Sequence, residues 1–258
     1  MKDDLLKPSE NLEQLLAVKR QKQYSVFTSL AYRGTAIGKK IFGRKTLLPL
    51  FLNSSRLFWR LAFELSGELY GDSFHAQVRV LSEDVLKKWI PKDGSVIDIG
   101  CGYGRWCRVA AKYAQRVVGV DYDQTVIEAA RERTKAENVE YLVGDVSKEL
   151  KGQKFDLALL SHVIEHIEES DSLLREVKNI ADKIIVEVPD FSSDSLNWVR
   201  LKHGFPFYSD GDHVQEYTLE TLQNQLERTG WKVLHHEKNN AAVLAVAAGR
   251  ENTSPSVS

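Results

Sequence analysis

The sequence has few of the features that mark secreted, disulfide-bonded or membrane-spanning proteins. It contains two cysteines, Cys101 and Cys107, and their spacing fits neither a zinc site nor a disulfide framework. The opening Met-Lys-Asp-Asp lacks the basic-then-apolar order of a signal peptide. No apolar run approaches the roughly 18 residues that a spanning helix needs. We therefore expect a protein of the reducing cytoplasm.

Acidic residues are absent from one long stretch, between Glu13 and Glu64. Residues 1–60 carry twelve Lys or Arg against four Asp or Glu, a balance of +8, although the whole chain has a net charge of −1. The basic residues are interleaved with Phe, Tyr, Trp and Leu. Such a segment suits an anionic partner or the anionic inner membrane surface, where it would hold the protein peripherally. The alternative is a solvated extension without a partner.

Glycine is missing from one position where a dinucleotide-binding loop needs it. Residues 96–104 read Val-Ile-Asp-Ile-Gly-Cys-Gly-Tyr-Gly and residue 105 is Arg, so the spacing is G-x-G-x-G rather than G-x-G-x-x-G. This argues against a nicotinamide enzyme. An apolar strand that ends in three alternating glycines still indicates a sharp turn close to a ligand.

Strands and helices alternate from about residue 94 to residue 249, which predicts an α/β fold with a parallel sheet and helices on both faces. The expected strands are 95–99, 116–120, 139–143, 155–160, 183–188, 232–237 and 242–247. The last two are joined by only four residues, so we expect the final strand to be antiparallel. We divide the chain into a helical N-terminal extension or lid over 1–90, with a loop at 34–46, a catalytic domain over 91–249, and a disordered tail over 250–258.

At the glycine loop the chain resembles the class I S-adenosylmethionine-dependent methyltransferases, whose first motif has this form. The resemblance implies a Rossmann-like sheet of seven strands, S-adenosyl-L-methionine as cofactor and methyltransferase activity (EC 2.1.1). It also implies that Asp121, after the second strand, binds the ribose hydroxyls and that Asp145, after the third, lies near the adenine. The predicted cofactor-binding residues are Asp98, Gly100, Cys101, Gly102, Gly104, Asp121, Tyr122, Asp145, Val146 and Ser161.

Two histidines and a glutamate follow the fourth predicted strand: His162, Glu165 and His166. A segment ending in Glu-His is common here in methyltransferases of small molecules, whereas DNA amino methyltransferases carry Asn or Asp before Pro-Pro. If the segment is helical, all three side chains lie on one face. His162 is a candidate general base, and structural capping or helix packing is an alternative role for this segment. A divalent metal on the three residues is an alternative. Relatives that bind a metal here have Glu in place of His162, so we predict no metal site.

A loop rich in aromatic and polar residues precedes the helix expected near Thr218, as in a loop over a substrate pocket. Its Asp-His-Val-Gln-Glu-Tyr-Thr segment resembles one in methyltransferases of sugar and glycan pathways. An imidazole suits removal of a proton from an alcohol, because it titrates near neutrality. We therefore predict His162, His166 and His213 as catalytic residues.

The sequence thus favours O-methylation of a small-molecule, sugar or lipid-linked glycan acceptor with a histidine as general base. Methylation of RNA or of a nitrogen atom, using the basic N-terminal segment, is one alternative. A catalytically silent protein that binds the cofactor is another.

Overall fold

A computed structural model describes residues 26–71, 78–150, 152–204 and 211–249. These residues form two compact units. The first contains residues 26–71 and 198–204, and the second contains the rest. The disordered tail predicted over 250–258 and the first part of the basic segment lie outside the described residues.

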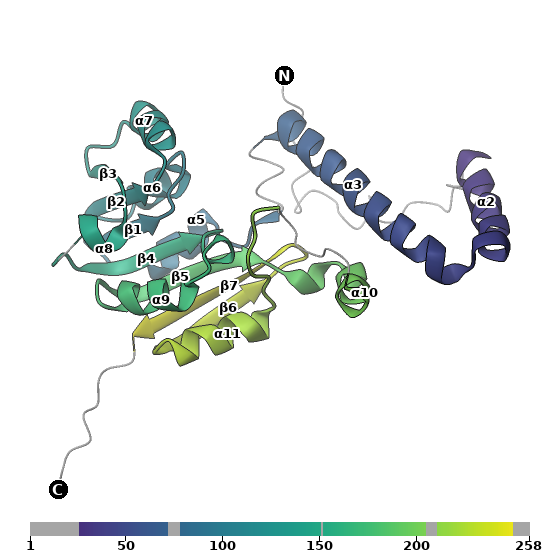
Figure 1. The fold of residues 1–258 in the computed structure, drawn as a ribbon. Helices are drawn as coiled ribbons and strands as arrows, with labels where there is room; N and C mark the ends of the chain where they lie inside the picture. Colours follow the sequence, from purple (N-terminus) through teal and green to yellow (C-terminus); the bar gives the residue numbers. More distant parts are fainter. Residues whose placement is uncertain (1–25, 72–77, 151, 205–210, 250–258) are drawn as a thin grey trace, which may run out of the picture. The chain divides into compact units, whose positions relative to one another are not determined.

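The second unit is built on a seven-stranded sheet with the order β3-β2-β1-β4-β5-β7-β6 (Figure 1). Its strands are β1 Ser95–Ile99, β2 Arg116–Asp121, β3 Val139–Val143, β4 Phe155–Ser161, β5 Ala181–Pro189, β6 Trp231–Lys238 and β7 Ala242–Gly249. β1 to β5 pair in parallel, whereas β7 is antiparallel to both β5 and β6. The seven predicted strands and the antiparallel last strand are confirmed.

Short helices connect the strands. They are α5 Glu83–Trp89, α6 Arg105–Ala110, α7 Gln124–Arg133, α8 Val146–Glu149, α9 Ser170–Lys178 and α11 Leu219–Arg228, with 3₁₀ turns η1 Ile164–His166 and η2 Phe191–Ser193. α11 begins where the sequence predicts, because Thr218 caps it and forms a capping box with Thr221. α10 Ser195–His203 lies in the long insertion after β5 and runs into the first unit.

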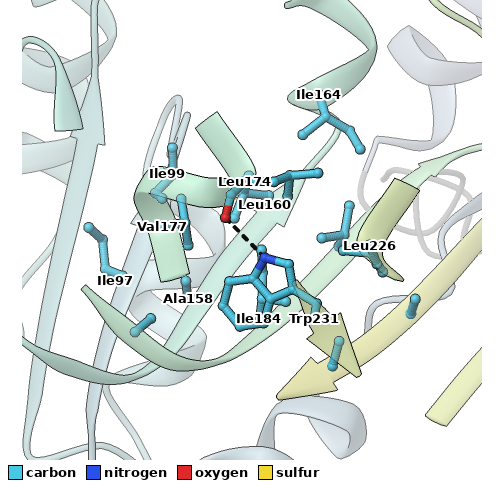
Figure 2. Close-up of a cluster of buried hydrophobic side chains, with 14 of the residues drawn as sticks. Ile97, Ile99, Ala158, Leu160, Ile164, Leu174, Val177, Ile184, Leu226 and Trp231 are labelled. Atoms are coloured by element: carbon cyan, nitrogen blue, oxygen red, sulfur yellow. Dashed lines mark hydrogen bonds between the residues drawn. The ribbon is translucent and has the colours of Figure 1, made fainter. Parts of the chain in front are cut away.

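Two hydrophobic cores cover the two faces of the sheet, because successive residues of a strand point to opposite sides. On β4, Leu157 and Leu159 belong to the core shared with α5, α6 and α7, and Ala158 and Leu160 to the other. Figure 2 shows the second core around Trp231, whose indole Nε1 donates a hydrogen bond of 3.0 Å to the Leu174 carbonyl of α9. The sheet is thereby packed on both faces.

Residues 26–71 of the first unit form two helices, α2 Val26–Phe42 and α3 Arg44–Tyr70. The loop predicted at 34–46 is therefore wrong, because only Gly43 interrupts the helices, with φ at 79°. Gly34 and Gly38 lie within α2, and a Cβ on Gly38 would come 3.3 Å from the Leu47 side chain of α3. Among the described residues, no helix is both long and apolar enough to cross a bilayer.

The segment from Val78 to Ile90 packs with the sheet of the second unit, although the sequence assigns it to the extension. Leu81, Val85 and Leu86 are buried in the core that also contains Val96 of β1. Ser82 caps α5 by accepting a hydrogen bond from Val85 N. These residues are therefore part of the sheet domain.

Candidate functional site

The glycine loop turns through three left-handed residues, Gly100, Gly102 and Gly104, with φ of 68°, 50° and 70°. The amides of Gly100 and Cys101 both donate to the Val120 carbonyl of β2, at 2.8 and 3.1 Å. A Cβ on Gly100 would come 2.7 Å from a methyl group of Val163. Glycine is therefore required here by conformation and by space.

Asp121 joins this loop to the end of β2. Its Oδ2 accepts from the Gly102 amide at 2.9 Å, and its Oδ1 accepts from the Asp123 amide at 3.1 Å. Each carboxylate oxygen has lone pairs for further hydrogen bonds. The carboxylate is thus fixed in position while it can still accept from a ligand.

A pocket of about 410 Å³ lies at the carboxyl ends of β1 to β4. It is lined by Ile99, Gly100, Val120, Asp121, Tyr122, Gly144, Asp145, Val146, His162, Val163, His166, Ile167 and Leu173. Ligands of open α/β sheets bind at this edge. Seven predicted site residues line it together: Gly100, Asp121, Tyr122, Asp145, Val146, His162 and His166.

Tyr122 is the most exposed aromatic residue of the pocket, with 72% of its surface accessible. Partial burial and the neighbouring Asp145 carboxylate raise the pKa of its hydroxyl, so this group is a neutral hydrogen-bond donor at physiological pH. Val146, by contrast, is buried where the pocket meets the core. The two side chains thus offer apolar surface of different exposure to a ligand.

The other predicted cofactor-binding residues lie behind or beside the pocket rather than on its surface. Asp98 is 2% exposed and its Oδ2 accepts from Cys107 Sγ at 3.2 Å. Burial raises the pKa of its carboxyl to about 7. Cys101 is buried in the core, and Gly102 and Gly104 shape the loop. They adjoin the glycine loop without lining the pocket.

Ser161 belongs to a buried polar network that the sequence analysis missed. Its Oγ donates to Glu187 Oε2 at 2.7 Å and accepts from Arg79 at 2.9 Å. Glu187, fully buried in β5, also accepts from the backbone amides of Val80 and Leu81, both at 2.7 Å. The available signal was a single acidic residue inside the apolar run Ile-Ile-Val-Glu-Val-Pro. The network attaches the segment before α5 to the sheet.

His162 does not lie on a helix, so the prediction of one helical face for His162, Glu165 and His166 is wrong. Its backbone is left-handed, with φ at 58°, because its amide donates to the Glu187 carbonyl at 2.9 Å as the chain leaves β4. Its ring still lies between two buried carboxylates. Nδ1 is 3.2 Å from Glu165 Oε1, and Nε2 is 3.6 Å from Glu187 Oε2.

Two histidine segments that are far apart in the sequence, one with His166 and one with His213, lie in contact. The amides of Val214 and Gln215 donate to the Glu165 carbonyl at 2.9 and 3.3 Å. This linkage brings the rings of His166 and His213 to a centroid distance of 4.7 Å at an angle of 80°. One ligand atom from each of Glu165, His166 and His213 lies within 4.8 Å of the others. This arrangement could hold a metal ion.

Comparison with known proteins identifies the family. A family model described as a methyltransferase domain matches residues 74–236. A ribosomal protein L11 methyltransferase of Alkaliphilus oremlandii is 28% identical over 222 residues, which is 84% of this chain and 62% of that protein. The chain thus spans less than two thirds of the length of this relative.

Solved structures share the fold. The PH0226 protein of Pyrococcus horikoshii superposes with a TM-score of 0.57 at 24% identity, covering 70% of this chain and 92% of that one. The N-methyltransferase NodS of Bradyrhizobium japonicum, in complex with S-adenosyl-L-homocysteine, does so with a TM-score of 0.51 at 15% identity, covering 66% and 84%. The chain belongs to the methyltransferase domain family, the class I S-adenosylmethionine-dependent methyltransferases.

Proposed function

We propose that this protein transfers a methyl group from S-adenosyl-L-methionine to an oxygen atom of a small-molecule or glycan acceptor. The observation that carries the proposal is that His162 and His166 line the same pocket as Asp121 and Asp145. One cavity thereby contains both the carboxylates that would bind the cofactor and the imidazoles that could accept a proton. Catalysis of this transfer requires mainly alignment of the acceptor, loss of its proton and exclusion of water.

The residues of the pocket fit the cofactor. The Asp121 carboxylate would accept from the two ribose hydroxyls, Asp145 would accept from the adenine amino group, and Tyr122 and Val146 would contact the ring. Gly100 and Val163 line the same pocket, where the amino acid part of the cofactor would lie. When bound, S-adenosyl-L-methionine supplies a methyl group on a positively charged sulfur.

His166 is our candidate for promoting loss of the acceptor's proton. Its side chain is 33% exposed and lines the pocket, and its Nδ1 lies 3.2 Å from the Asp212 carboxylate. A carboxylate at one ring nitrogen orients a histidine so that the other can accept a proton. His162 is less suited, because its Nε2 is buried and faces Glu187. His213 would support the His166 ring through their edge contact.

Labelled cofactor tests this function. The protein is incubated with methyl-labelled S-adenosylmethionine and a cell extract, and the products are separated into small molecules, lipid-linked glycans, protein and RNA. We expect label in the first two fractions, in an alkali-stable ether linkage. We expect His166→Ala to lose most of the transfer and His236→Ala, an exposed histidine on β6, to retain it. Label confined to protein or RNA would contradict an oxygen acceptor of this kind.

A second candidate is N-methylation of a protein. It is favoured by the curated relative that is named a ribosomal protein L11 methyltransferase and aligns with 84% of this chain. The same experiment separates the two, since amide- and amine-linked label in the protein fraction would support this candidate.

We also propose that the helices of the first unit contact an anionic membrane surface, where a lipid-linked acceptor would be found. Four basic residues surround the break between α2 and α3: Lys39, Lys40, Arg44 and Lys45. The same helices expose large apolar residues such as Ile41, Phe42 and Phe58. Such a combination favours peripheral binding. Sedimentation with vesicles containing anionic lipid should decrease when all four basic residues are changed to Glu, and equal binding would contradict the proposal.

A further inference from the structure

We propose that Glu165, His166 and His213 form a binding site for a divalent metal ion of the Zn²⁺ type beside the pocket. The binding proposal stands on the geometry of the described residues. Only its consequence for catalysis rests on the proposed function. The sequence analysis predicted no metal and had considered a different set, His162, Glu165 and His166.

Glu165 is the first reason. Its side chain is fully buried, and neither carboxylate oxygen has a hydrogen-bond partner in the structure. An ionised carboxylate in such surroundings is unfavourable unless a cation compensates it. The imidazole Nδ1 of His162 lies 3.2 Å from Oε1. A divalent ion would compensate the charge more fully, with His162 as hydrogen-bond donor to the ligating carboxylate.

The orientation of the two histidines is the second reason. His166 Nδ1 lies 3.2 Å from Asp212 Oδ2, and His213 Nδ1 lies 3.0 Å from Glu216 Oε1. A carboxylate at Nδ1 selects the tautomer that protonates this nitrogen and leaves the lone pair on Nε2. Metal-ligating histidines are almost always held in this way. Two histidines oriented in this way beside one buried carboxylate are arranged as the ligands of a metal ion are.

The backbone holds the ligands together without the ion. Glu165 and His166 lie on η1, and the segment of His213 is attached to it by the two amides that donate to the Glu165 carbonyl. The next residues are fixed as well, because Phe191 N donates to the Tyr217 carbonyl at 2.7 Å and Tyr217 is fully buried. The site therefore requires little rearrangement to bind an ion, which lowers the entropic cost.

The ligand types select the ion. Two imidazoles and one carboxylate suit Zn²⁺ and its neighbours in the first transition row, whereas Mg²⁺ and Ca²⁺ require a shell made mainly of oxygens. Three protein ligands leave a coordination position open, as in catalytic zinc sites. The carboxylate of Glu165 belongs to the cluster, and those of Asp212 and Glu216 lie beside its two histidines. The charge of this group of residues is therefore negative when the imidazoles are neutral, which favours binding of a cation.

The ion would lie next to the pocket, since His166 is also a lining residue. An acceptor hydroxyl that occupied the open position would have a lowered pKa and would release its proton to water. With the ion bound, the second ring nitrogen of His166 would be a metal ligand rather than a proton acceptor, so His166 would then promote deprotonation by holding the ion. The edge contact between the two imidazoles would position the second ligand.

The test is metal binding by the full chain. Protein stripped with EDTA is titrated with Zn²⁺ against a coloured chelator, and with Co²⁺ by visible absorption, which reports the ligands. We expect one ion per chain. His213→Ala should weaken binding by about 100-fold or more, and Glu216→Gln by about 10- to 100-fold. His236→Ala, a histidine outside the cluster, is the matched control and should bind as the unchanged protein does.

Thermal unfolding provides an independent readout. Zn²⁺ should raise the Tm of the unchanged chain and of His236→Ala, and raise it less in Glu216→Gln. If His213→Ala does not fold, the Glu216→Gln result decides. Absence of saturable binding of one ion, equal affinity in Glu216→Gln, or a thiolate band in the Co²⁺ spectrum would overturn the site. Full methyl transfer after chelation would overturn the catalytic consequence alone, whereas binding without any transfer would contradict the proposed function and leave the site standing.

Discussion

Asp98 and the loop glycines are neighbours in the sequence, but different physical terms hold them in place. Asp98 supports the loop from inside the core, where burial keeps its carboxyl protonated over a range in which an exposed aspartate is ionised. The glycines are held by backbone conformation, and for Gly100 and Gly104 also by lack of space. A substitution can measure each of these contributions to stability.

Asp98 should make stability fall as pH rises from about 4 to about 7. In this window the unfolded chain has lost the proton and the folded chain retains it, because the pKa is raised from 3.8 to about 7. The full difference is on the order of 4 kcal/mol. Asp98→Asn should flatten this slope in Tm measured from pH 4 to 8, and Asp182→Asn, an exposed aspartate on β5, should not. Parallel slopes in all three proteins would show that Asp98 is ionised.

Gly104→Ala should destabilise the protein more than Gly102→Ala. Both residues are left-handed, which costs an L side chain roughly 1–2 kcal/mol. A Cβ on Gly104 would also collide with the Tyr141 hydroxyl, whereas nothing lies within 4 Å of one on Gly102. Tyr141 is buried and bonded to Thr134, so overpacking should add about 1–3 kcal/mol. Urea denaturation measures both variants, and equal midpoints would contradict the account.

At the scale of elements, strands were predictable because buried parallel strands appear as apolar runs ended by turns. The helices of the first unit were harder to predict. Gly34 and Gly38 suggested a loop, but a glycine inside a helix costs only about 1 kcal/mol, and Gly38 also permits close packing on Leu47. The meeting of Glu165 with Val214 could not be predicted, because it depends on how the insertion after β5 folds back over the sheet.

The start of α11 gives a test at this scale. Thr218 accepts from Thr221 N at 3.2 Å, and its amide donates to the Thr221 hydroxyl at 2.8 Å. Thr218→Ala should therefore lower the free energy of unfolding by about 1 kcal/mol. Thr125→Ala is the control, since α7 is capped by Asp123 instead. A loss of equal size in both variants would contradict a specific role for the cap.

At the scale of the whole molecule, the order of motifs along the chain predicted most of the pocket. Asp121 and Asp145 line it because the carboxyl ends of parallel neighbouring strands meet at one edge. Asp98 and Ser161 do not, because sequence order gives no information on side-chain depth: one is buried under the loop and the other turns toward Glu187. The histidine end of the pocket depends on long-range contacts, and the sequence predicted it least.

Calorimetric titration with S-adenosylmethionine tests the central claim, that this pocket binds the methyl donor, most directly. The unchanged chain and Asp182→Ala should bind one molecule with the same affinity. Asp121→Ala should bind at least about 10- to 100-fold more weakly. The ribose would lose charge-assisted hydrogen bonds, and the Gly102 amide would lose its acceptor. Unchanged affinity in Asp121→Ala, or no binding by the unchanged chain, would contradict the account.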